Sequence, residues 1–247
     1  YQASKFELKP YVKSKRWGNF NYKKLKELKN ISKSEGFYDI RFIDKEGNIL
    51  FSLNYEDDLG TNIYTGKYSK TLFAETSKKA LEKDLVLFSD LEYYKPSNNK
   101  ISGFIIKSLK DSDDNIFGLI AYQISSEQLN TVMQRSVGLG KTGLAFIIGP
   151  DQLLRSSTST SYNDSILQKK INTVNTRKWI NLYTQNRVNY NTLTDSLYKN
   201  DGKLLAYKNA EGIWVYGLYM NLKRLSDYGI HWAIFEEFDH SEAFLYN

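Results

Sequence analysis

The chain has 247 residues, a formal net charge of +6 at pH 7 and no cysteine. Without cysteine it cannot form disulfides, cysteine-containing zinc sites or thiol nucleophiles. Hydrophobic residues make up 41% of the sequence, with 19 Tyr and 13 Phe, which excludes an intrinsically disordered chain. No apolar run reaches the roughly 18–20 residues that a membrane-spanning helix requires. No signal peptide is recognisable, and because the chain starts at Tyr1 we expect it to be part of a longer protein.

The positive charge is concentrated at the N-terminal end. Residues 1–35 hold ten Lys or Arg and three Glu, a local charge of +7 that leaves −1 for the remainder of the chain. Such a segment can attract nucleic acid or anionic lipid. The alternative is a solvated helix face, and in residues 23–29 the lysines surround Leu25 and Leu28 in the way that this predicts. No nucleic-acid-binding motif with interleaved aromatic residues is present, so we expect a solvated helix and no nucleic-acid partner.

The first half of the chain is predicted to contain two helices, two strands, a third helix and three further strands. In chain order we expect helices at 1–15 and 20–35, strands at 38–43 and 49–53, a loop at 54–69, a helix at 70–82, and strands at 85–94, 101–109 and 116–125. The two helices are expected to separate around Trp17–Asn19, and Gly36 follows the second helix as a C-terminal glycine commonly does. Residues 44–48 are a polar turn between two apolar runs, which indicates a hairpin.

The second half shows a similar succession. We expect a helix from Ser126 to about Arg135, a flexible link at 138–143, strands at 144–149 and 153–156, a polar loop at 156–163, a helix at about 164–184, and strands at 191–198, 203–210, 213–222 and 230–238. Ser126 is a typical N-cap residue, and Leu129, Val132 and Met133 follow it on one helical face.

The two halves resemble each other. Residues 38–52 and 144–157 are both two apolar runs around a turn, and residues 103–125 and 214–238 are both two strands around a polar turn. The copies lie roughly 105–111 residues apart, which is too long a period for a solenoid and suits two tandem domains. The predicted fold is therefore α+β: a long N-terminal helix followed by two tandem PAS-like modules, each a central antiparallel sheet flanked by helices. The expected domains are 1–36, the N-terminal helical segment; 37–137, the first module; and 138–247, the second.

Each residue pattern that suggests catalysis lacks the structural context that the chemistry needs. Gly138–Gly143 matches G-x-G-x-x-G, but a dinucleotide site needs this pattern after a strand and before a helix, and here the order is reversed. The two histidines, His231 and His240, have no other metal-ligating residues near them at helical or hairpin spacing. Glu236 and Glu237 point to opposite faces of a predicted strand and cannot share a site. The sequence therefore predicts no enzyme, no metal site and no cofactor.

Several motifs, taken in order, resemble a known family. They are residues 36–48, 57–62, 90–97, 140–143, 149–156 and 232–244. Together they are similar to the double Cache (PDC) family of sensor domains, and the resemblance covers about residues 30–247. Two departures are visible. Residues 143–146 read Gly-Leu-Ala-Phe where relatives usually have Gly-Glu-Ser/Thr-Tyr, and the Arg-x-Trp-Tyr motif of the amino-acid-binding members is not found between residues 55 and 85.

The resemblance implies a function. Members of the family are extracytoplasmic sensor domains of bacterial transmembrane receptors, such as histidine kinases, chemoreceptors and some cyclases. It implies a membrane-distal first module, a membrane-proximal second module that leads to a transmembrane helix, and a homodimer formed through the N-terminal helix. The expected location is the periplasmic or extracellular part of a receptor in the cell membrane. Any kinase or cyclase activity would belong to the cytoplasmic part, which leaves this chain without enzymatic activity.

In this fold the distal sheet forms the floor of a ligand pocket and residues 54–69 with the following helix form its lid. Strand alternation then selects side chains that share one face. The predicted ligand-binding residues are Tyr68, Asp90, Tyr94, Phe104, Ile106, Ala121 and Gln123. Asp90 and Gln123 would be the polar anchors of an otherwise aromatic pocket, with Asp90 suited to a ligand ammonium. The alternative for Asp90 is that it caps the turn at residues 94–97.

The leading hypothesis is thus a ligand-sensing receptor domain that binds a small molecule in its distal module. Ligand binding would close that module and shift the long helix against its partner in a dimer, so that the movement crosses the membrane. Two alternatives come from other classes. One is a binder of nucleic acid or an anionic surface through residues 1–35, and the other is a module that docks a periplasmic partner protein.

Overall fold

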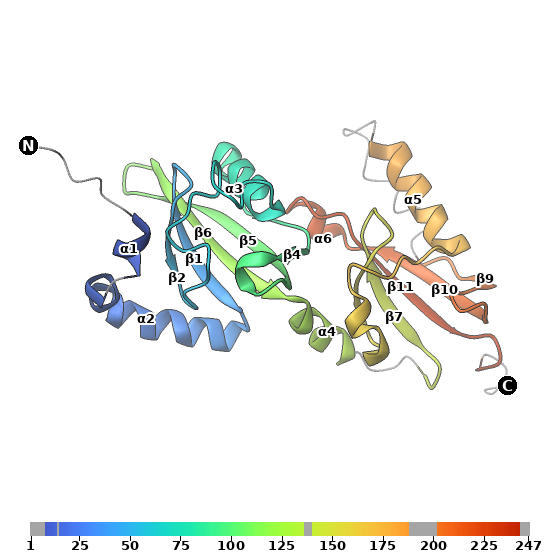
Figure 1. Ribbon diagram of the computed structural model, residues 1–247. Coiled ribbons are helices and arrows are strands. Elements are labelled where there is room, and N and C mark those ends of the chain that lie inside the picture. The colour runs from blue at the N-terminus through green and yellow to red at the C-terminus, as the bar shows by residue number, and fades with distance from the viewer. Residues whose placement is uncertain (1–7, 14, 136–139, 188–201, 243–247) are drawn as a thin grey trace, which may run out of the picture. The chain divides into compact units, whose positions relative to one another are not determined.

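The computed structural model describes residues 8–13, 15–135, 140–187 and 202–242 (Figure 1). Contacts divide the chain into two compact units, Tyr1–Ser125 and Ser126–Asn247. The predicted domain boundaries, with a division after residue 137, stay a prediction. Within the described ranges, no helix combines the length and the apolar character needed to cross a bilayer.

The first unit is an antiparallel sheet between helices. Its elements are α1 (Leu8–Val12), α2 (Lys15–Glu35), β1 (Asp39–Asp44), β2 (Ile49–Ser52), α3 (Leu72–Lys83), β3 (Leu87–Phe88), β4 (Glu92–Tyr94), a 3-10 turn at Lys95–Ser97, β5 (Lys100–Lys110) and β6 (Ile116–Ser125). The strand order is β2-β1-β6-β5-β3, with β4 also paired to β5. The first strand therefore lies in the interior of the sheet, with β2 and β6 on its two sides.

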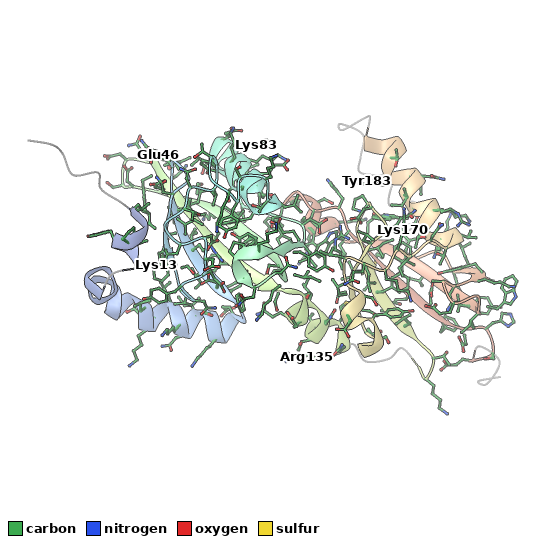
Figure 2. The ribbon with its side chains drawn as sticks, viewed as in Figure 1. Lys13, Glu46, Lys83, Arg135, Lys170 and Tyr183 are labelled. Carbon is green, nitrogen blue, oxygen red and sulfur yellow. The ribbon has the colours of Figure 1, made fainter. Side chains whose placement is uncertain are left out.

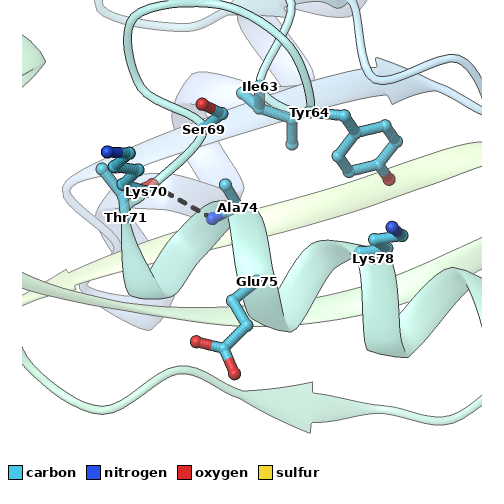
Figure 3. Close-up of a pocket in the computed structure, with 8 residues that line it drawn as sticks. All are labelled: Ile63, Tyr64, Ser69, Lys70, Thr71, Ala74, Glu75 and Lys78. Carbon is cyan, nitrogen blue, oxygen red and sulfur yellow. Dashed lines mark hydrogen bonds between the residues drawn. The ribbon is translucent and has the colours of Figure 1, made fainter.

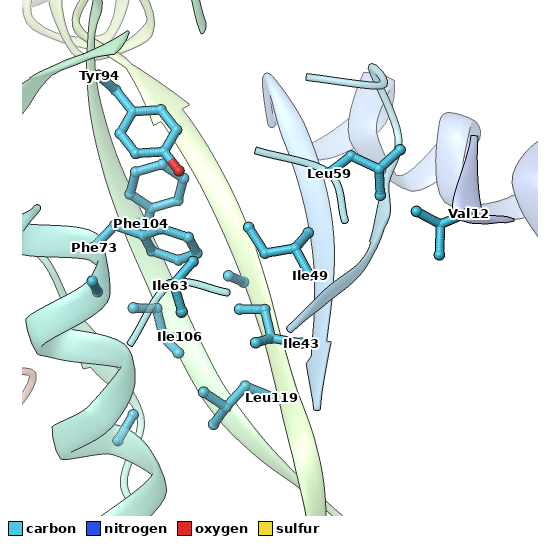
Figure 4. Close-up of a cluster of buried hydrophobic side chains, with 13 residues drawn as sticks. Val12, Ile43, Ile49, Leu59, Ile63, Phe73, Tyr94, Phe104, Ile106 and Leu119 are labelled. Carbon is cyan, nitrogen blue, oxygen red and sulfur yellow. The ribbon is translucent and has the colours of Figure 1, made fainter. Parts of the chain in front are cut away.

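The two faces of this sheet pack against different helices, α2 on one side and α3 on the other (Figure 1). Successive side chains of a strand point to opposite faces, so β1 contributes to both. Ile40 packs with Leu25 and Leu28 of α2. Ile43 belongs to the larger apolar cluster on the α3 side, which also contains Phe73 (Figure 4).

Helix α3 is fixed at its N-terminal end by two side chains. Thr71 is the N-cap, and its Oγ1 accepts a hydrogen bond from the Ala74 backbone N–H at 3.1 Å (Figure 3). The Glu92 carboxylate accepts hydrogen bonds from the backbone N–H groups of Leu72 and Phe73, at 3.1 and 2.9 Å. Because Glu92 lies on β4, this cap also positions α3 over the sheet.

The second unit repeats the arrangement. Its elements are α4 (Ser126–Gln134), β7 (Leu144–Ile148), β8 (Leu154–Ser157), a 3-10 turn at Thr160–Ser165, α5 (Val174–Arg187), β9 (Leu205–Lys208), β10 (Trp214–Asn221), α6 (Lys223–Ser226) and β11 (Ala233–Asp239). Its strand order, β8-β7-β11-β10-β9, is the order of the first sheet with each strand replaced by its counterpart. The predicted fold class, α+β with two antiparallel PAS-like sheets, is confirmed.

Two predicted helix boundaries were wrong. Helix α2 runs from Lys15 through the expected break at Trp17–Asn19, because a single Gly18 costs only about 1 kcal/mol in a helix. Helix α5 begins at Val174 and not near residue 164. The 3-10 turn at Thr160–Ser165 is followed by a further turn and a short irregular stretch. In this stretch the Lys169 carbonyl accepts a hydrogen bond from the Leu154 N–H at 3.0 Å, so the segment is held against β8.

The predicted strand at 85–94 is interrupted. Only Leu87–Phe88 and Glu92–Tyr94 are strands. Between them Asp90 Oδ1 accepts a hydrogen bond from the Leu91 backbone N–H at 2.7 Å, a local bond that competes with strand pairing. The strand predicted at 191–198 lies outside the described residues.

The start of α5 explains its late position and gives a test. Thr173 Oγ1 accepts a bond from the Thr176 N–H at 3.2 Å, and Thr176 Oγ1 accepts one from the Thr173 N–H at 2.9 Å. This reciprocal pair satisfies two helix-end donors, as a capping box does. We expect Thr173→Ala to lower the stability of the second unit by about 1 kcal/mol.

Tryptophan fluorescence during urea unfolding measures this loss, since Trp179, Trp214 and Trp232 all lie in the second unit. Thr131→Ala is the matched control, because Thr131 is exposed and bonds only to a carbonyl within α4. Equal losses in the two variants would contradict a capping role for Thr173.

Candidate functional site

A fully buried arginine lies on β1 in the first unit. Arg41 Nε donates to Asp58 Oδ2 at 2.9 Å, and Nη1 lies 3.0 Å from Asp39 Oδ2 and donates to Gln123 Oε1 at 2.6 Å. The side chains of Arg41, Asp39 and Asp58 have 0% exposure. We call Arg41, Asp39, Asp58, Tyr94 and Gln123 the Arg41 cluster.

Strand alternation places this charge inside. Asp39, Arg41 and Ile43 share the face of β1 that looks toward α3, while Ile40 points to α2. Asp39 is held by its own surroundings: it accepts hydrogen bonds from Ser52 Oγ at 2.8 Å and from the backbone N–H of Ile40, also at 2.8 Å. Asp39 is therefore held in place by hydrogen bonds that do not involve Arg41.

The segment between β2 and α3, residues 53–71, covers this face without helix or strand, and we call it the lid. Its Asp58 joins it to the sheet, because Oδ2 accepts from both Arg41 Nε and Tyr94 Oη, the latter at 2.5 Å. The Asn54 N–H donates to Asp39 Oδ1 at 3.0 Å, and Tyr38 Oη donates to Glu56 Oε1 at 2.8 Å. The lid is thus tied to the sheet through carboxylates.

Aromatic rings surround the arginine. The guanidinium carbon of Arg41 lies 5.9 Å from the Phe73 ring centre, 5.4 Å from that of Tyr94 and 5.3 Å from that of Phe104. Phe73 and Phe104 stack with centroids 4.0 Å apart. A desolvated cation in such a setting gains up to about 2 kcal/mol from each well-placed ring face.

Two polar atoms in the cluster have no partner among the described residues: Arg41 Nη2 and Asp58 Oδ1. A buried unpaired group costs about 1–3 kcal/mol. Burial alone would lower the pKa of Arg41, but the carboxylates of Asp58 and Asp39 raise it above its ordinary value, so the arginine stays charged. Burial and the Asp58 charge raise the pKa of Tyr94, which stays a neutral donor. Buried charged groups that lack a hydrogen-bond partner, close to groups with shifted pKa values, make the cluster a candidate functional site.

The structure brings most of the predicted site residues together. Five of them have 0% exposure on the sheet face under α3: Tyr94, Phe104, Ile106, Ala121 and Gln123. The Tyr94 and Phe104 ring centres are 4.9 Å apart. Gln123 bonds to Arg41 and also donates to Ser102 Oγ at 2.7 Å.

The other two predicted residues lie elsewhere. Tyr68 is 7% exposed within the lid, with the Lys67 ammonium 4.5 Å from its ring centre. Asp90 is half-buried in the turn between β3 and β4, where it accepts the Leu91 N–H. That bond is to the next residue and not to the turn at residues 94–97, so both interpretations of Asp90 and ligand binding by all seven residues stay predictions.

Sequence reasoning missed Arg41, Asp39 and Asp58. A signal was available, because Asp39 and Arg41 are two residues apart in an otherwise apolar strand and therefore share a face. Asp58 could not be found in this way. Its contact with Arg41 depends on the path of the lid, which has no repeating pattern.

The G-x-G-x-x-G motif has a structural use in the second unit. Glu242 accepts hydrogen bonds from the backbone N–H groups of Lys141 and Thr142, both at 2.8 Å, and from Thr142 Oγ1. Gly140 has φ +73°, and a Cβ there would collide with the Glu242 carboxylate. The glycine-rich loop therefore binds a carboxylate of its own chain just after β11. These hydrogen bonds, that of the Thr142 hydroxyl first, lower the pKa of Glu242.

The histidines pack on rings: His231 lies 5.4 Å from Tyr183 and His240 lies 4.9 Å from Tyr216, between ring centres. Within the described part of the chain, no group of three or more His, Asp or Glu side chains could hold a metal ion. Glu237 is 5% exposed and accepts from Tyr207 Oη at 2.6 Å, whereas Glu236 lies on the other face of β11.

Comparison with solved structures identifies the fold. The ligand-binding domain of the Campylobacter jejuni chemoreceptor Tlp3, in complex with 4-methylisoleucine, aligns with a TM-score of 0.59 and 14% identity over 95% of this chain and 77% of that one. The corresponding domain of the Pseudomonas aeruginosa amino acid chemoreceptor PctB, in complex with L-Arg, gives 0.55 and 14% over 86% and 75%. The extracellular domain of the putative histidine kinase rpHK1S-Z16 gives 0.57 and 12% over 90% and 78%.

No protein-family model matches the chain, and no curated protein sequence does either. The class that these neighbours define is that of the tandem PAS-like sensor domains of bacterial receptors. This chain has the fold of a double Cache sensor domain, as its sequence motifs predict.

The Arg41 cluster makes a prediction about stability. Arg41→Met leaves Asp39 and Asp58 buried without their counter-charge, and we expect the first unit to lose about 3–5 kcal/mol. Arg155→Met in the second unit is the matched control: Arg155 is also buried, but its partner Asp151 is 46% exposed and can be solvated. Amide hydrogen exchange in β5 and β6 measures the stability lost in Arg41→Met. Exchange in β7 and β11 measures the stability lost in the control, Arg155→Met. If Arg41→Met lowers stability no more than Arg155→Met does, the buried carboxylates of the first unit do not depend on the charge of Arg41.

The Glu242 loop makes a prediction about pH. A carboxylate with a lowered folded pKa stabilises the fold above its unfolded pKa, about 4.3 for glutamate, and this stabilisation is lost as the pH falls through the folded value. We expect Glu242→Gln to lower the melting temperature of the second unit at pH 7, with the difference shrinking toward pH 3. Glu236→Gln on β11 is the control. A pH-independent difference between Glu242→Gln and the unchanged chain would refute the charge-based role.

Proposed function

We propose that this chain is the extracytoplasmic ligand-sensing domain of a bacterial transmembrane signalling receptor, of the sensor histidine kinase or chemoreceptor type. It binds a small molecule in the first unit and transmits binding as a helix shift. The fold supports this assignment. The observation that carries it is the Arg41 cluster, a charged centre enclosed by aromatic rings, with one donor and one acceptor left open.

The chemistry of the cluster suggests the kind of ligand. Arg41 Nη2 offers a charged donor to a carboxylate or similar anionic group, since the guanidinium fork suits planar oxyanions. Asp58 Oδ1 offers an acceptor to an ammonium or N–H group. Solved neighbours were determined with L-Arg, L-Gln and L-valine bound, and amino acids are therefore the first ligands to test. Tyr68, Asp90 and Gln123 stay proposed contacts.

The lid connects binding to the N-terminal helices. Asp58 ties the lid to Arg41, and its neighbour Leu59 is 1% exposed in the same apolar cluster as Val12 of α1 (Figure 4). A ligand that bridges Arg41 and Asp58 stabilises the closed lid and, with it, the packing around Val12. The ligand acts because it binds the closed arrangement better than an open one. In the intact receptor, we propose, α2 pairs with its copy in a homodimer and passes this shift toward a membrane anchor.

Ligand binding is tested by thermal shift of the chain with amino acids, small carboxylates, amines and purines. A ligand at about 100 times its dissociation constant adds about 2.7 kcal/mol, which is a shift of several degrees. We expect Arg41→Lys to weaken binding at least about tenfold, because lysine lacks the second N–H group of the fork. Arg155→Lys in the second unit should leave the affinity unchanged.

Asp90→Ala separates the two interpretations of that residue. If Asp90 anchors a ligand ammonium, the substitution weakens binding as Arg41→Lys does. If Asp90 only caps its turn, affinity is retained while stability falls slightly. A screen without any hit in all four ligand classes would refute small-molecule sensing and favour the alternative, in which the module docks a periplasmic partner protein.

A further inference from the structure

A second feature of the first unit is a cavity of about 260 Å³ between the lid and the outer side of α3 (Figure 3). The lid contributes Ile63, Tyr64 and Lys70, and the helix contributes Ala74 and Lys78. Ile63 and Ala74 also belong to the apolar cluster. The cavity thus lies over the layer that covers the Arg41 cluster and is a different site.

The two ammonium groups are arranged around an apolar floor. Figure 3 shows Lys70 at one end of the cavity and Lys78 at the other, with Ile63 and Ala74 between them. Ala74 and Lys78 are four residues apart and therefore lie on one helical face. The order along the cavity is cation, hydrocarbon, cation.

These charges are not neutralised by the protein. Within the part of the chain that the structure describes, neither Lys70 nor Lys78 forms an ion pair. The one carboxylate in the lining, Glu75, is bonded to Lys79 at 2.7 Å. Lys70 and Lys78 are therefore available to an anion.

Tyr64 adds a neutral donor. Its Oη is buried and has no hydrogen-bond partner among the described residues. Burial, with the charges of Asp44 and Glu82 nearby, raises the pKa of Tyr64 to about 12, so the hydroxyl keeps its proton at neutral pH. Asp44 does not use this proton, because its oxygens accept from the Asn48 N–H and Nδ2 at 2.7 and 2.8 Å.

We propose that this cavity is a second ligand site, which takes a small dianion with an apolar middle. One anionic end meets Lys70, the other meets Lys78 and the Tyr64 hydroxyl, and the hydrocarbon lies on Ile63 and Ala74. Because Lys70 is on the lid and Lys78 is on α3, a bound dianion links the two elements. It would then regulate the opening of the lid over the Arg41 cluster.

Isothermal titration at low ionic strength tests the site with glutarate as the probe. Butyrate has the same apolar middle but one anionic end, and inorganic phosphate has no apolar middle. We expect glutarate to bind at least about tenfold more tightly than either, since each charged hydrogen bond lost corresponds to roughly one power of ten. Equal affinities for the three anions would refute the arrangement, and so would the absence of glutarate binding up to about 10 mM.

Matched variants locate the probe. We expect Lys70→Gln and Lys78→Gln each to weaken glutarate binding about tenfold, and Tyr64→Phe to weaken it several-fold. Lys83→Gln makes the same charge change in the last turn of α3, outside the cavity lining, and should have no effect (Figure 2). If Lys83→Gln weakens glutarate binding as much as Lys78→Gln, the effect comes from the overall positive charge of the helix, and the proposed site is refuted.

Competition separates this site from the proposed sensing site. An amino acid found in the screen and glutarate occupy different places in this proposal, so saturating glutarate should not displace the amino acid. Mutual displacement would place the anion at the Arg41 cluster and overturn the second site. A failed amino-acid screen with intact glutarate binding would refute the sensing proposal alone.

Discussion

The buried charge of Arg41 is the constraint on which the first unit depends. Removing a charged group from water costs several kcal/mol, and the cost is offset only when partners of opposite charge are held in good geometry. Asp39 supplies one partner from the same strand, and Asp58 supplies the other from the lid. The lid therefore cannot leave the sheet without exposing an unbalanced charge. A segment without helix or strand is in this way tied to the sheet by an ion pair.

The duplicated second unit shows what the first would be without this charge. Arg41 pairs with Ala121 and Ser52, and the equivalent position on β7, which pairs with Phe235 and Ser157, is Phe146. There the rings of Phe146 and Phe235 stack with centroids 5.5 Å apart. An apolar pair thus fills the place of the ion network. Of the two sheets, only the first carries an unpartnered donor and acceptor at this position, and this difference is the reason that we propose ligand binding in the first unit.

The elements with a clear period could be predicted from the sequence, and so could the face they present. Strand alternation, applied to the pocket floor that the family resemblance implies, grouped Tyr94, Phe104 and Gln123. The start of α5 could not be found in this way, because Ile166 and Ile171 continue a helical pattern through a segment that in fact contains turns and an irregular stretch. The ion pair between Arg41 and Asp58 spans 17 residues and depends on the turns of the lid, and no local pattern encodes it.

The same packing that closes the lid also reaches the N-terminal helices. Leu59 follows Asp58 directly, so any displacement of the carboxylate from Arg41 also displaces a side chain with 1% exposure. Val12 of α1, equally buried in that cluster, rests on the same packing. Close-packed interiors pass such shifts on because they have few voids to absorb them. In the proposed function, loss or gain of a charge contact at β1 would in this way become a change of packing at α1.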